Sequence, residues 1–231
     1  MNCAFPYGTA TPILPGYELL VGSPEDDWLA GSRDPDEILG GFGADWVLGD
    51  RGGDLIYGGS GSSFVGGQMA LATAADGADS ILGCGGDDLL DGAGGDDVLR
   101  GGAGDDTLIG GLGADRLIGG PGLDLFRFGL TPTGPDGGLG PANRDVIADF
   151  TPGEDLLDLR GYRGDGGEAL TWLGEAPLAA RPHGAVRVEA RGEDMLVELD
   201  LALPSQAADG VADVAILLRE TAELTTANLL L

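Results

Sequence analysis

The sequence has no lysine, a single histidine and only two cysteines among its 231 residues. Its 12 basic side chains are all arginines, and they face 39 acidic ones, so the formal net charge is -27. Such a chain repels nucleic acid and anionic membranes, whose phosphates are neutralised by Lys and Arg, and it favours cations as partners. Two cysteines exclude a disulfide framework. We expect unpaired thiols, although a single bridge between Cys3 and Cys84 stays open.

Long hydrophobic runs and an N-terminal export signal are also missing. No stretch is long enough for a transmembrane helix. The start, MNCAFPYGTATPILPGYELLVG, lacks the basic region and unbroken apolar core of a secretory signal peptide. Hydrophobic residues still make up 42% of the chain, which is too many for a disordered acidic tail. We therefore expect a folded protein in which the acidic charge is tolerated or bound by cations.

Common catalytic motifs are absent as well. The zinc-protease signature H-E-x-x-H and the G-x-S-x-G nucleophile elbow do not occur. With no lysine and one histidine, the usual general bases and nucleophile partners are nearly missing. His183 stands between Pro182 and Gly184, a setting typical of an exposed turn. The sequence predicts that the protein is not an enzyme, with a small enzyme that uses an acidic site as an alternative.

Glycine, in contrast, is abundant, with 45 residues that recur in the pattern G-G-x-G-x-D-x-U-x, where U is a large apolar residue. Blocks of nine run in phase over residues 22–66 and, after an interruption at 67–73, over residues 74–127. The glycines suit a turn with positive φ. The last three residues suit a short strand, whose side chains alternate between two faces. The series predicts a stacked repeat fold.

The eighth residue of each block is expected to point inward and form the core. These residues are Leu29, Ile38, Val47, Ile56, Val65, Ile81, Leu90, Leu99, Leu108, Leu117 and Phe126.

The seventh residue points outward, and in three blocks spaced by 18 residues it is aromatic: Trp28, Trp46 and Phe64. Neighbouring strands lie about 4.8 Å apart, so these side chains can stack on one sheet. Three explanations stay open for this row. The first is burial under the N-terminal segment, the interruption loop or the cap. The second is a surface for self-association or for a partner. The third is a platform on which sugars stack.

The repeats resemble the RTX, or haemolysin-type, calcium-binding repeats. The resemblance implies an all-β fold, a parallel β-roll (a β-solenoid) in which two blocks make one turn of the coil. It also implies several Ca²⁺ ions, held between stacked turns by the sixth-position aspartates and by loop carbonyls, in keeping with the oxygen ligands that Ca²⁺ prefers. The implied ligands are Asp27, Asp36, Asp45, Asp54, Asp79, Asp88, Asp97, Asp106, Asp115 and Asp124.

Some blocks depart from the pattern. Glu25 and Asp34 stand where the fourth-position glycine is expected, and Ser63 replaces the sixth-position aspartate, so we expect weaker sites there. The aspartates could simply cap turns, as Asp often does. Stacked carboxylates repel one another without a cation, however. Metal binding and folding are therefore expected to be coupled.

After Arg127 the period is lost, and alternating runs such as GAVRVEA predict further strands. Residues 143–162 resemble the segment that follows the roll in serralysin-type proteases and alginate epimerase repeat modules, where a D-x-I-x-D-F…G-x-D-x-I-D-L motif closes the open end. The matching residues are Asp145, Ile147, Asp149, Phe150, Gly153, Asp155, Leu157, Asp158 and Leu159. We expect an N-terminal segment (1–21), a roll (22–127) and a β-rich cap (128–231) that covers the last turn.

The chain ends in TTANLLL, which resembles in part the uncleaved C-terminal signal of type I secretion substrates, with Asn228 in place of an acid. An ordinary last strand is the alternative. The resemblance implies export by a type I secretion apparatus from a Gram-negative type of host, with folding where Ca²⁺ is abundant. We expect a secreted, extracellular calcium-binding protein with a structural, adhesive or interaction role. The alternative is a polysaccharide-binding (alginate-like) module beside a separate enzyme.

Overall fold

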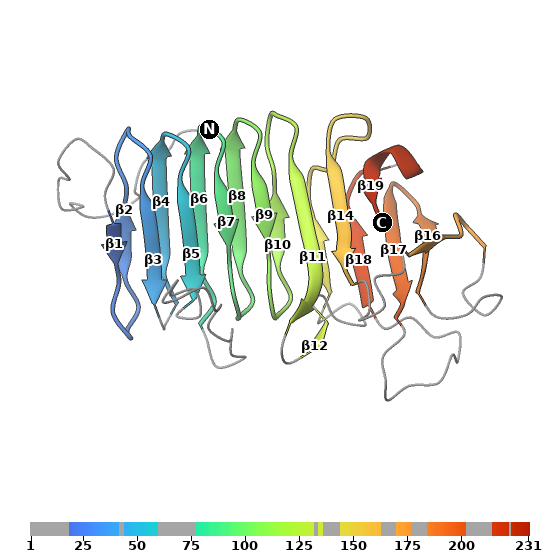
Figure 1. The fold of residues 1–231 in the computed structure, drawn as a ribbon, viewed down its shortest axis with the longest axis horizontal. Helices are drawn as coiled ribbons and strands as arrows, with labels where there is room; N and C mark the ends of the chain where they lie inside the picture. The colour runs from blue at the N-terminus through green and yellow to red at the C-terminus, as the bar shows by residue number, and fades with distance from the viewer. Residues whose placement is uncertain are drawn as a thin grey trace.

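The computed structural model describes residues 19–41, 44–59, 77–131, 134–135, 144–162, 170–176, 184–201, 214–221 and 223–231. Each nine-residue block contributes one short strand, and Figure 1 shows these strands stacked along the long axis of the molecule. The strands are β1 (Leu19–Val21), β2 (Trp28–Ala30), β3 (Glu37–Gly41), β4 (Trp46–Arg51), β5 (Leu55–Gly59), β6 (Ser80–Gly85), β7 (Leu89–Asp91), β8 (Val98–Ala103), β9 (Thr107–Ile109), β10 (Arg116–Ile118), β11 (Leu125–Thr131), β12 (Gly134–Pro135), β13 (Asp145–Ile147), β14 (Leu156–Gly161), β15 (Thr171–Trp172), β16 (Ala185–Arg191), β17 (Asp194–Asp200), β18 (Val214–Leu218) and β19 (Leu229–Leu230); a 3-10 helix, η3, covers Thr226–Asn228.

Successive strands of the roll alternate between two sheets. Sheet A has the order β1-β3-β5-β7-β9-β11-β14-β19, and sheet B has the order β15-β16-β17-β18-β13-β10-β8-β6-β4-β2. Pairing between neighbouring turns of the roll is parallel, as between β3 and β5 or β6 and β8. The predicted all-β parallel roll with a β-rich continuation is therefore confirmed.

The core is one column of eighth-position side chains between the two sheets. Ile38, Ile56, Leu90 and Phe126 of sheet A and Leu99 of sheet B are completely buried. Leu29, in the first full turn, is only partly buried, and Val65 lies outside the described residues. Burying one such side chain contributes about 1.5–3 kcal/mol. The predicted inward position is thus confirmed along the described roll.

The register corrects the reading of residues 58–66 as a repeat. Val47 of β4 pairs with Ile81 of β6, a step of 34 residues where other turns take 18, so 16 residues are inserted here. Gly58 lies against Asp79, and both belong to one turn. Residues 60–76 thus stand where the repeat has a single residue, between Gly59 and Gly77. The prediction that residues 58–66 form a block was wrong because GGSGSSFVG has glycines at the positions where a repeat has them.

The C-terminal part continues both sheets. β13 extends sheet B beside β10, and β14 extends sheet A beside β11. β16, β17 and β18 then form an antiparallel meander that joins β13 through β18. The tail forms η3 and β19, which pairs with β14. In the tail, Asn228 is buried and takes part in a capping box with Thr225. None of the described residues forms a helix long and apolar enough to cross a membrane.

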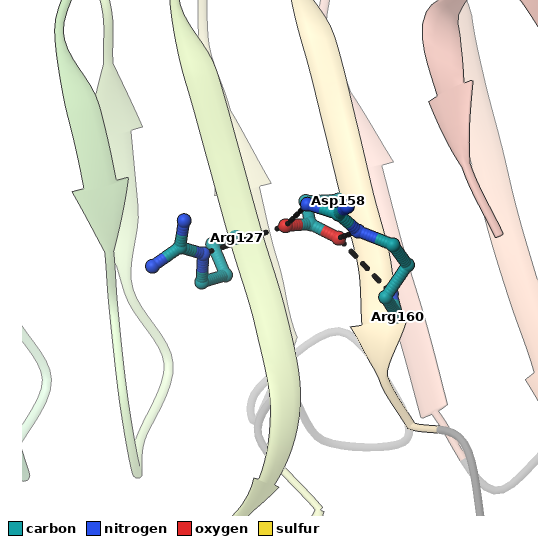
Figure 2. A network of polar contacts seen from close by, with 3 residues as sticks. All are labelled: Arg127, Asp158 and Arg160. Carbon is teal, nitrogen blue, oxygen red and sulfur yellow. Dashed lines mark hydrogen bonds and ion pairs between the residues drawn. The ribbon is translucent and has the colours of Figure 1, made fainter. Parts of the chain in front are cut away.

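An arginine pair on the outside of sheet A ties the roll to this continuation (Figure 2). Arg160 of β14 donates from Nε to Oδ1 of Asp158 at 2.8 Å and from Nη2 to Oδ2 at 2.9 Å. Nε of Arg127, on β11, lies 3.4 Å from Oδ2 of the same carboxylate. The hydrogen bonds from Arg160 hold the pKa of Asp158 below its usual value. The carboxylate therefore stays ionised between the two strands.

The expectation of unpaired thiols is wrong for Cys84. This residue lies in β6 and is disulfide-bonded. It occupies the second position of its block with a φ of 83°, a conformation that the repeat usually gives to glycine. Cys3, the other cysteine of the sequence, lies outside the described residues.

Candidate metal-binding turns

The sixth-position aspartates line the two edges of the roll, where the chain passes from one sheet to the other. At the edge that leads from sheet A to sheet B they are Asp27, Asp45, Asp79, Asp97 and Asp115; at the opposite edge they are Asp36, Asp54, Asp88, Asp106 and Asp124. Except for Asp27, which is partly exposed, all of them are buried. So many buried carboxylates need hydrogen-bond or ionic partners, because moving an unpaired charge out of water costs free energy.

From Asp45 and Asp54 onward, each aspartate accepts a hydrogen bond from the aspartate one coil turn earlier. The backbone N–H of Asp54 donates to Oδ1 of Asp88 at 2.7 Å, and that of Asp88 donates to Oδ1 of Asp106 at 2.9 Å. The same bond recurs along both edges. These bonds form two aspartate ladders that fix the register of the stacked turns. The ladders use only one oxygen of each carboxylate.

The ladders run further than the sequence predicted. Asp115 donates from its backbone N–H to Oδ1 of Asp145 at 2.8 Å, and Asp124 donates to Oδ1 of Asp155 at 3.0 Å. These last steps span 30 and 31 residues, so a search for a nine-residue period misses them. Both aspartates belong to the D-x-I-x-D-F…G-x-D-x-I-D-L motif of the cap, which is the feature of the sequence that could have identified them as members of the ladders.

The second carboxylate oxygen has no partner along most of the ladder. In the described part of the chain, Oδ2 is buried and accepts no hydrogen bond in Asp54, Asp88, Asp106, Asp115, Asp124 and Asp145. Leaving a buried charged acceptor unsatisfied costs about 1–3 kcal/mol or more. Six such atoms, four along one ladder and two along the other, indicate turns that suit a positively charged partner.

The first-position glycines leave room beside these oxygens. A Cβ atom on Gly83 would collide with Oδ2 of Asp88 and would stand 2.7 Å from the carbonyl oxygen of Gly101 in the next turn. Gly49 has the same relation to Asp54 and Gly83. A carboxylate oxygen and a carbonyl oxygen from different turns therefore converge on a space that any side chain would fill.

The electrostatics of the turns favour protonation of the ladder unless a cation is present. Burial is the main cause, and it raises the pKa of Asp88 to about 6 and the pKa of Asp54, Asp106 and Asp124 to about 7, against the backbone hydrogen bonds that lower them. Burial also raises the pKa of the neighbours Asp115 and Asp145. A bound cation would restore the ionised form of these groups.

In the loops of the first two nine-residue blocks, Oδ2 of the aspartate does accept a hydrogen bond. The backbone N–H of Ser23 donates to Oδ2 of Asp27 at 2.5 Å, and that of Ser32 donates to Oδ2 of Asp36 at 2.5 Å. In the cap, Thr151 does the same for Asp155 at 2.7 Å. Asp27 and Asp36 at the start of the ladders and Asp155 at the end of one of them are therefore satisfied by their own turns, whereas Asp145 at the end of the other is not.

The donor set fits a hard cation. Within the described ranges, no three acidic, histidine or cysteine side chains come together as a metal cluster. An ion in these turns would thus combine single carboxylates with backbone carbonyls. Such all-oxygen ligation suits Ca²⁺, which accepts six to eight oxygens in flexible geometry, rather than metals that prefer nitrogen or sulfur. The residues present therefore fit Ca²⁺.

The outward aromatic row is partly as expected. Trp28 and Trp46 stack in parallel, with ring centroids 5.2 Å apart and an interplanar angle of 5°, and they are 49% and 43% exposed. The predicted place of Phe64 is wrong, because Ser80 pairs with Trp46 on the next strand; Phe64 and His183 lie outside the described residues. The row is a pair of tryptophans rather than a line of three.

The outer face of sheet B lacks carboxylates at the seventh and ninth positions from β2 to β13. The side chains there, in the described strands, are Trp28, Ala30, Trp46, Leu48, Ser80, Leu82, Val98, Arg100, Arg116, Ile118, Val146 and Ala148. The same positions of sheet A include Glu37, Asp91 and Asp158. In a chain of net charge -27, this acid-free face is a distinct surface.

Comparison with known proteins agrees with the repeat pattern. The family model of the RTX calcium-binding nonapeptide repeat matches in four copies, over residues 21–56, 30–65, 72–99 and 91–126. No curated protein matches the chain significantly in sequence.

Three solved structures illustrate the similarity. The AlgE6R3 subunit of the Azotobacter vinelandii mannuronan C5-epimerase is 27% identical, with 74% of this chain and 82% of that chain covered and a TM-score of 0.30. The AlgE6R2 subunit of the same enzyme is 23% identical, with 91% of each chain covered and a TM-score of 0.34. The extracellular lipase LipA from Serratia marcescens is 17% identical, with 95% of this chain and 40% of that chain covered and a TM-score of 0.27.

Proposed function

Because residues 21–65 and 72–126 carry RTX calcium-binding nonapeptide repeats, we propose that this protein is a secreted, non-enzymatic calcium-binding protein whose roll is completed by Ca²⁺. The observation that carries the proposal is the array of buried Oδ2 atoms without a partner in the middle turns. In those turns, hydrogen bonds from the protein satisfy Oδ1 of the aspartates, so the remaining oxygen is the one available to an ion.

The proposed ligands are the ladder aspartates together with carbonyls of the first-position glycines. Asp54, Asp88, Asp106, Asp115, Asp124 and Asp145 contribute most, since their Oδ2 atoms are free of hydrogen bonds. Asp45, Asp79 and Asp97 hold equivalent places in the ladder that continues to Asp115 and Asp145. Asp27 and Asp36 contribute least, because Ser23 and Ser32 already donate to them.

Calcium would supply positive charge to turns that otherwise gather carboxylates. In its absence the ladder aspartates must be protonated or must repel one another, and either condition disfavours the stacked fold near neutral pH. Since an ion that binds only the folded chain stabilises it, folding should depend on the calcium concentration. This dependence suits a chain that crosses a secretion channel unfolded and folds outside the cell, in a structural, adhesive or interaction role.

A calcium titration of the full chain, followed by circular dichroism and by sizing on the same sample, tests the proposal. We expect the strand signal to rise and the hydrodynamic radius to fall as Ca²⁺ is added, with reversal by a chelator. Mg²⁺ at the same concentration is the control, because it demands a small octahedral site. A strand signal that does not respond to Ca²⁺ would overturn the proposal.

A second candidate function is binding of an acidic polysaccharide, favoured by the acid-free face of sheet B. The stacked Trp28 and Trp46 offer flat apolar surface, and Arg100 and Arg116 lie on neighbouring strands of the same face. Aromatic planes suit sugar rings, and guanidinium groups pair with carboxylates.

Titration of the calcium-loaded protein with a uronate polymer, observed by calorimetry, tests this candidate. Binding should weaken in the variant Trp28→Ala/Trp46→Ala and in Arg100→Ala/Arg116→Ala. Arg127→Ala, on sheet A, is the matched control and should bind normally. Equal binding by all three variants would assign the interaction to another surface.

A further inference from the structure

A separate cavity of about 420 Å³ lies at the cap end of the molecule, at the end opposite β1 and β2 in Figure 1. It forms where the turn after β15 meets β16, β17 and the segment that leads into η3. Its described lining is Trp172, Gly174, Glu175, Val188, Met195, Glu223, Leu224, Thr225 and Thr226. This volume is within the range of small-molecule sites.

The floor of the cavity is apolar and rigidly held. Val188, Met195 and Leu224 are each at most 6% exposed and belong to the main core. Trp172, partly buried, packs against the same core. The turn that carries Glu175 is fixed to β16, because Val188 donates from its backbone N–H to the carbonyl of Gly174 at 2.8 Å. Three of the floor residues thus come from strands β15, β16 and β17, and the turn of Glu175 is tied to β16.

The rim is acidic and rich in acceptors. Glu175 and Glu223 are both exposed, and the described lining contains no basic side chain. The Thr225 hydroxyl is already used, since it accepts a hydrogen bond from the backbone N–H of Ala227 at the start of η3. A ligand that complements this rim must carry positive charge.

We propose that this cavity binds a small organic cation, an ammonium group on an apolar body. The apolar body would rest on Trp172, Val188, Met195 and Leu224, and the ammonium group would lie at the rim that carries the two glutamates. Tryptophan is also the side chain that best attracts a cation to its ring face. A bare calcium ion suits the place poorly, since two carboxylates and an apolar floor offer fewer oxygens than it takes. The inference is independent of the aspartate ladders.

Tryptophan fluorescence gives a direct test, because the sequence has only three tryptophans. The background variant Trp28→Phe/Trp46→Phe leaves Trp172 as the only one. The probe is hexyltrimethylammonium, added to the calcium-loaded full chain at constant ionic strength. We expect a saturable change in Trp172 emission at millimolar concentration. Hexan-1-ol should bind at least tenfold more weakly, and hexanoate and tetramethylammonium should give no saturable change.

The glutamates provide the decisive variants. Glu175→Gln/Glu223→Gln, in the same background, should weaken binding of the probe at least tenfold. Glu25→Gln/Glu154→Gln removes the same charge from exposed sites elsewhere and should bind as the background protein does. Calorimetry on the protein with all three tryptophans checks that the background variant has not altered the cavity.

Several results would overturn the proposal. Equal binding of hexan-1-ol would mean that the cavity is merely apolar. An equal response to tetramethylammonium, or an equal loss in both glutamine pairs, would mean that cations gather around the acidic protein without a site. Unchanged binding after Glu175→Gln/Glu223→Gln would remove the two glutamates from any role.

Discussion

The loops of the first two nine-residue blocks (residues 22–30 and 31–39) and the loops of the later blocks share a sequence pattern but differ in backbone conformation. In the later blocks that the structure describes from end to end, beginning with residues 49–57, the fourth position is a glycine with positive φ, from 118° at Gly52 to 157° at Gly122. The second position is also left-handed there, even at Asp50 and Ala93. In the first two blocks the second position is Ser23 or Ser32 and the fourth is Glu25 or Asp34. None of these four residues has positive φ.

This difference decides what the sixth-position aspartate binds. When the second residue is not left-handed, its backbone N–H reaches Oδ2 of the aspartate, as in Ser23 and Asp27. When it is left-handed, Oδ2 is left without a hydrogen bond, as in Asp54 and Asp106. An Oδ2 without a hydrogen bond therefore accompanies the glycine pattern and is not a property of the aspartate alone.

Replacing a fourth-position glycine of a late turn should destabilise the roll most. In Gly104→Ala the new Cβ would collide with the carbonyl of Gly86, at a φ of 140°. Left-handed strain and overpacking together predict a loss of about 2–5 kcal/mol in the free energy of unfolding. Urea unfolding in saturating Ca²⁺ measures it.

Two controls separate the causes. Gly153→Ala has positive φ but no atom within 4 Å of the new Cβ, so only about 1–2 kcal/mol should be lost. Glu25→Ala, at the same repeat position in the first turn, should change stability by less than about 0.5 kcal/mol. Similar losses at Gly104 and Glu25 would show that the two regions do not differ as described.

Removing a ladder carboxylate should reduce calcium affinity in the middle of the roll and hardly at its start. For Asp106→Asn we expect the calcium concentration at half-maximal folding to rise about tenfold, which corresponds to about 1.4 kcal/mol. For Asp27→Asn, whose Oδ2 is satisfied by Ser23, we expect less than about a twofold rise, because little of the calcium binding depends on it. Circular dichroism during calcium titration measures both midpoints, and equal shifts would contradict the contrast.

Acid should partly replace calcium. The pKa values of Asp54, Asp106 and Asp124 are raised to about 7 in the fold, above the value of about 3.9 in an unfolded chain. Their contribution to stability is therefore complete below pH 4 and is lost as the pH rises through 7. With a chelator present, we expect more strand signal at pH 5 than at pH 8. A larger signal at pH 8 would refute this.

The smallest effect should come from the arginine pair of Figure 2. Arg160→Ala removes two hydrogen bonds to Asp158, but the guanidinium is about half exposed, so solvent screens the interaction. We expect a slight decrease in melting temperature and no change in the calcium midpoint. A change in the calcium midpoint would mean that the junction of roll and cap takes part in metal binding.

The nine-residue period was sufficient to predict a stacked repeat fold and the core column from Ile38 to Phe126, which is buried. The parallel roll was predicted from the resemblance to RTX repeats, and the burial of the ladder aspartates was not predicted. The period could not predict where the insertion falls, because the glycines of residues 58–66 imitate a repeat while Asp79 completes the turn that Gly58 begins. It also missed Asp145 and Asp155 as ladder members, since their spacing depends on loops of irregular length. The cavity beside Trp172 joins segments with no common period, so only the folded chain brings them together.

Hydrogen exchange of the full chain, with and without Ca²⁺, distinguishes the first two blocks from the later ones, because it reports each turn separately. We predict that calcium strongly slows exchange of the ladder amides from Asp54 to Asp124, while the amides of Asp27 and Asp36 change much less. Uniform protection along the whole roll, or none in its middle turns, would contradict the account.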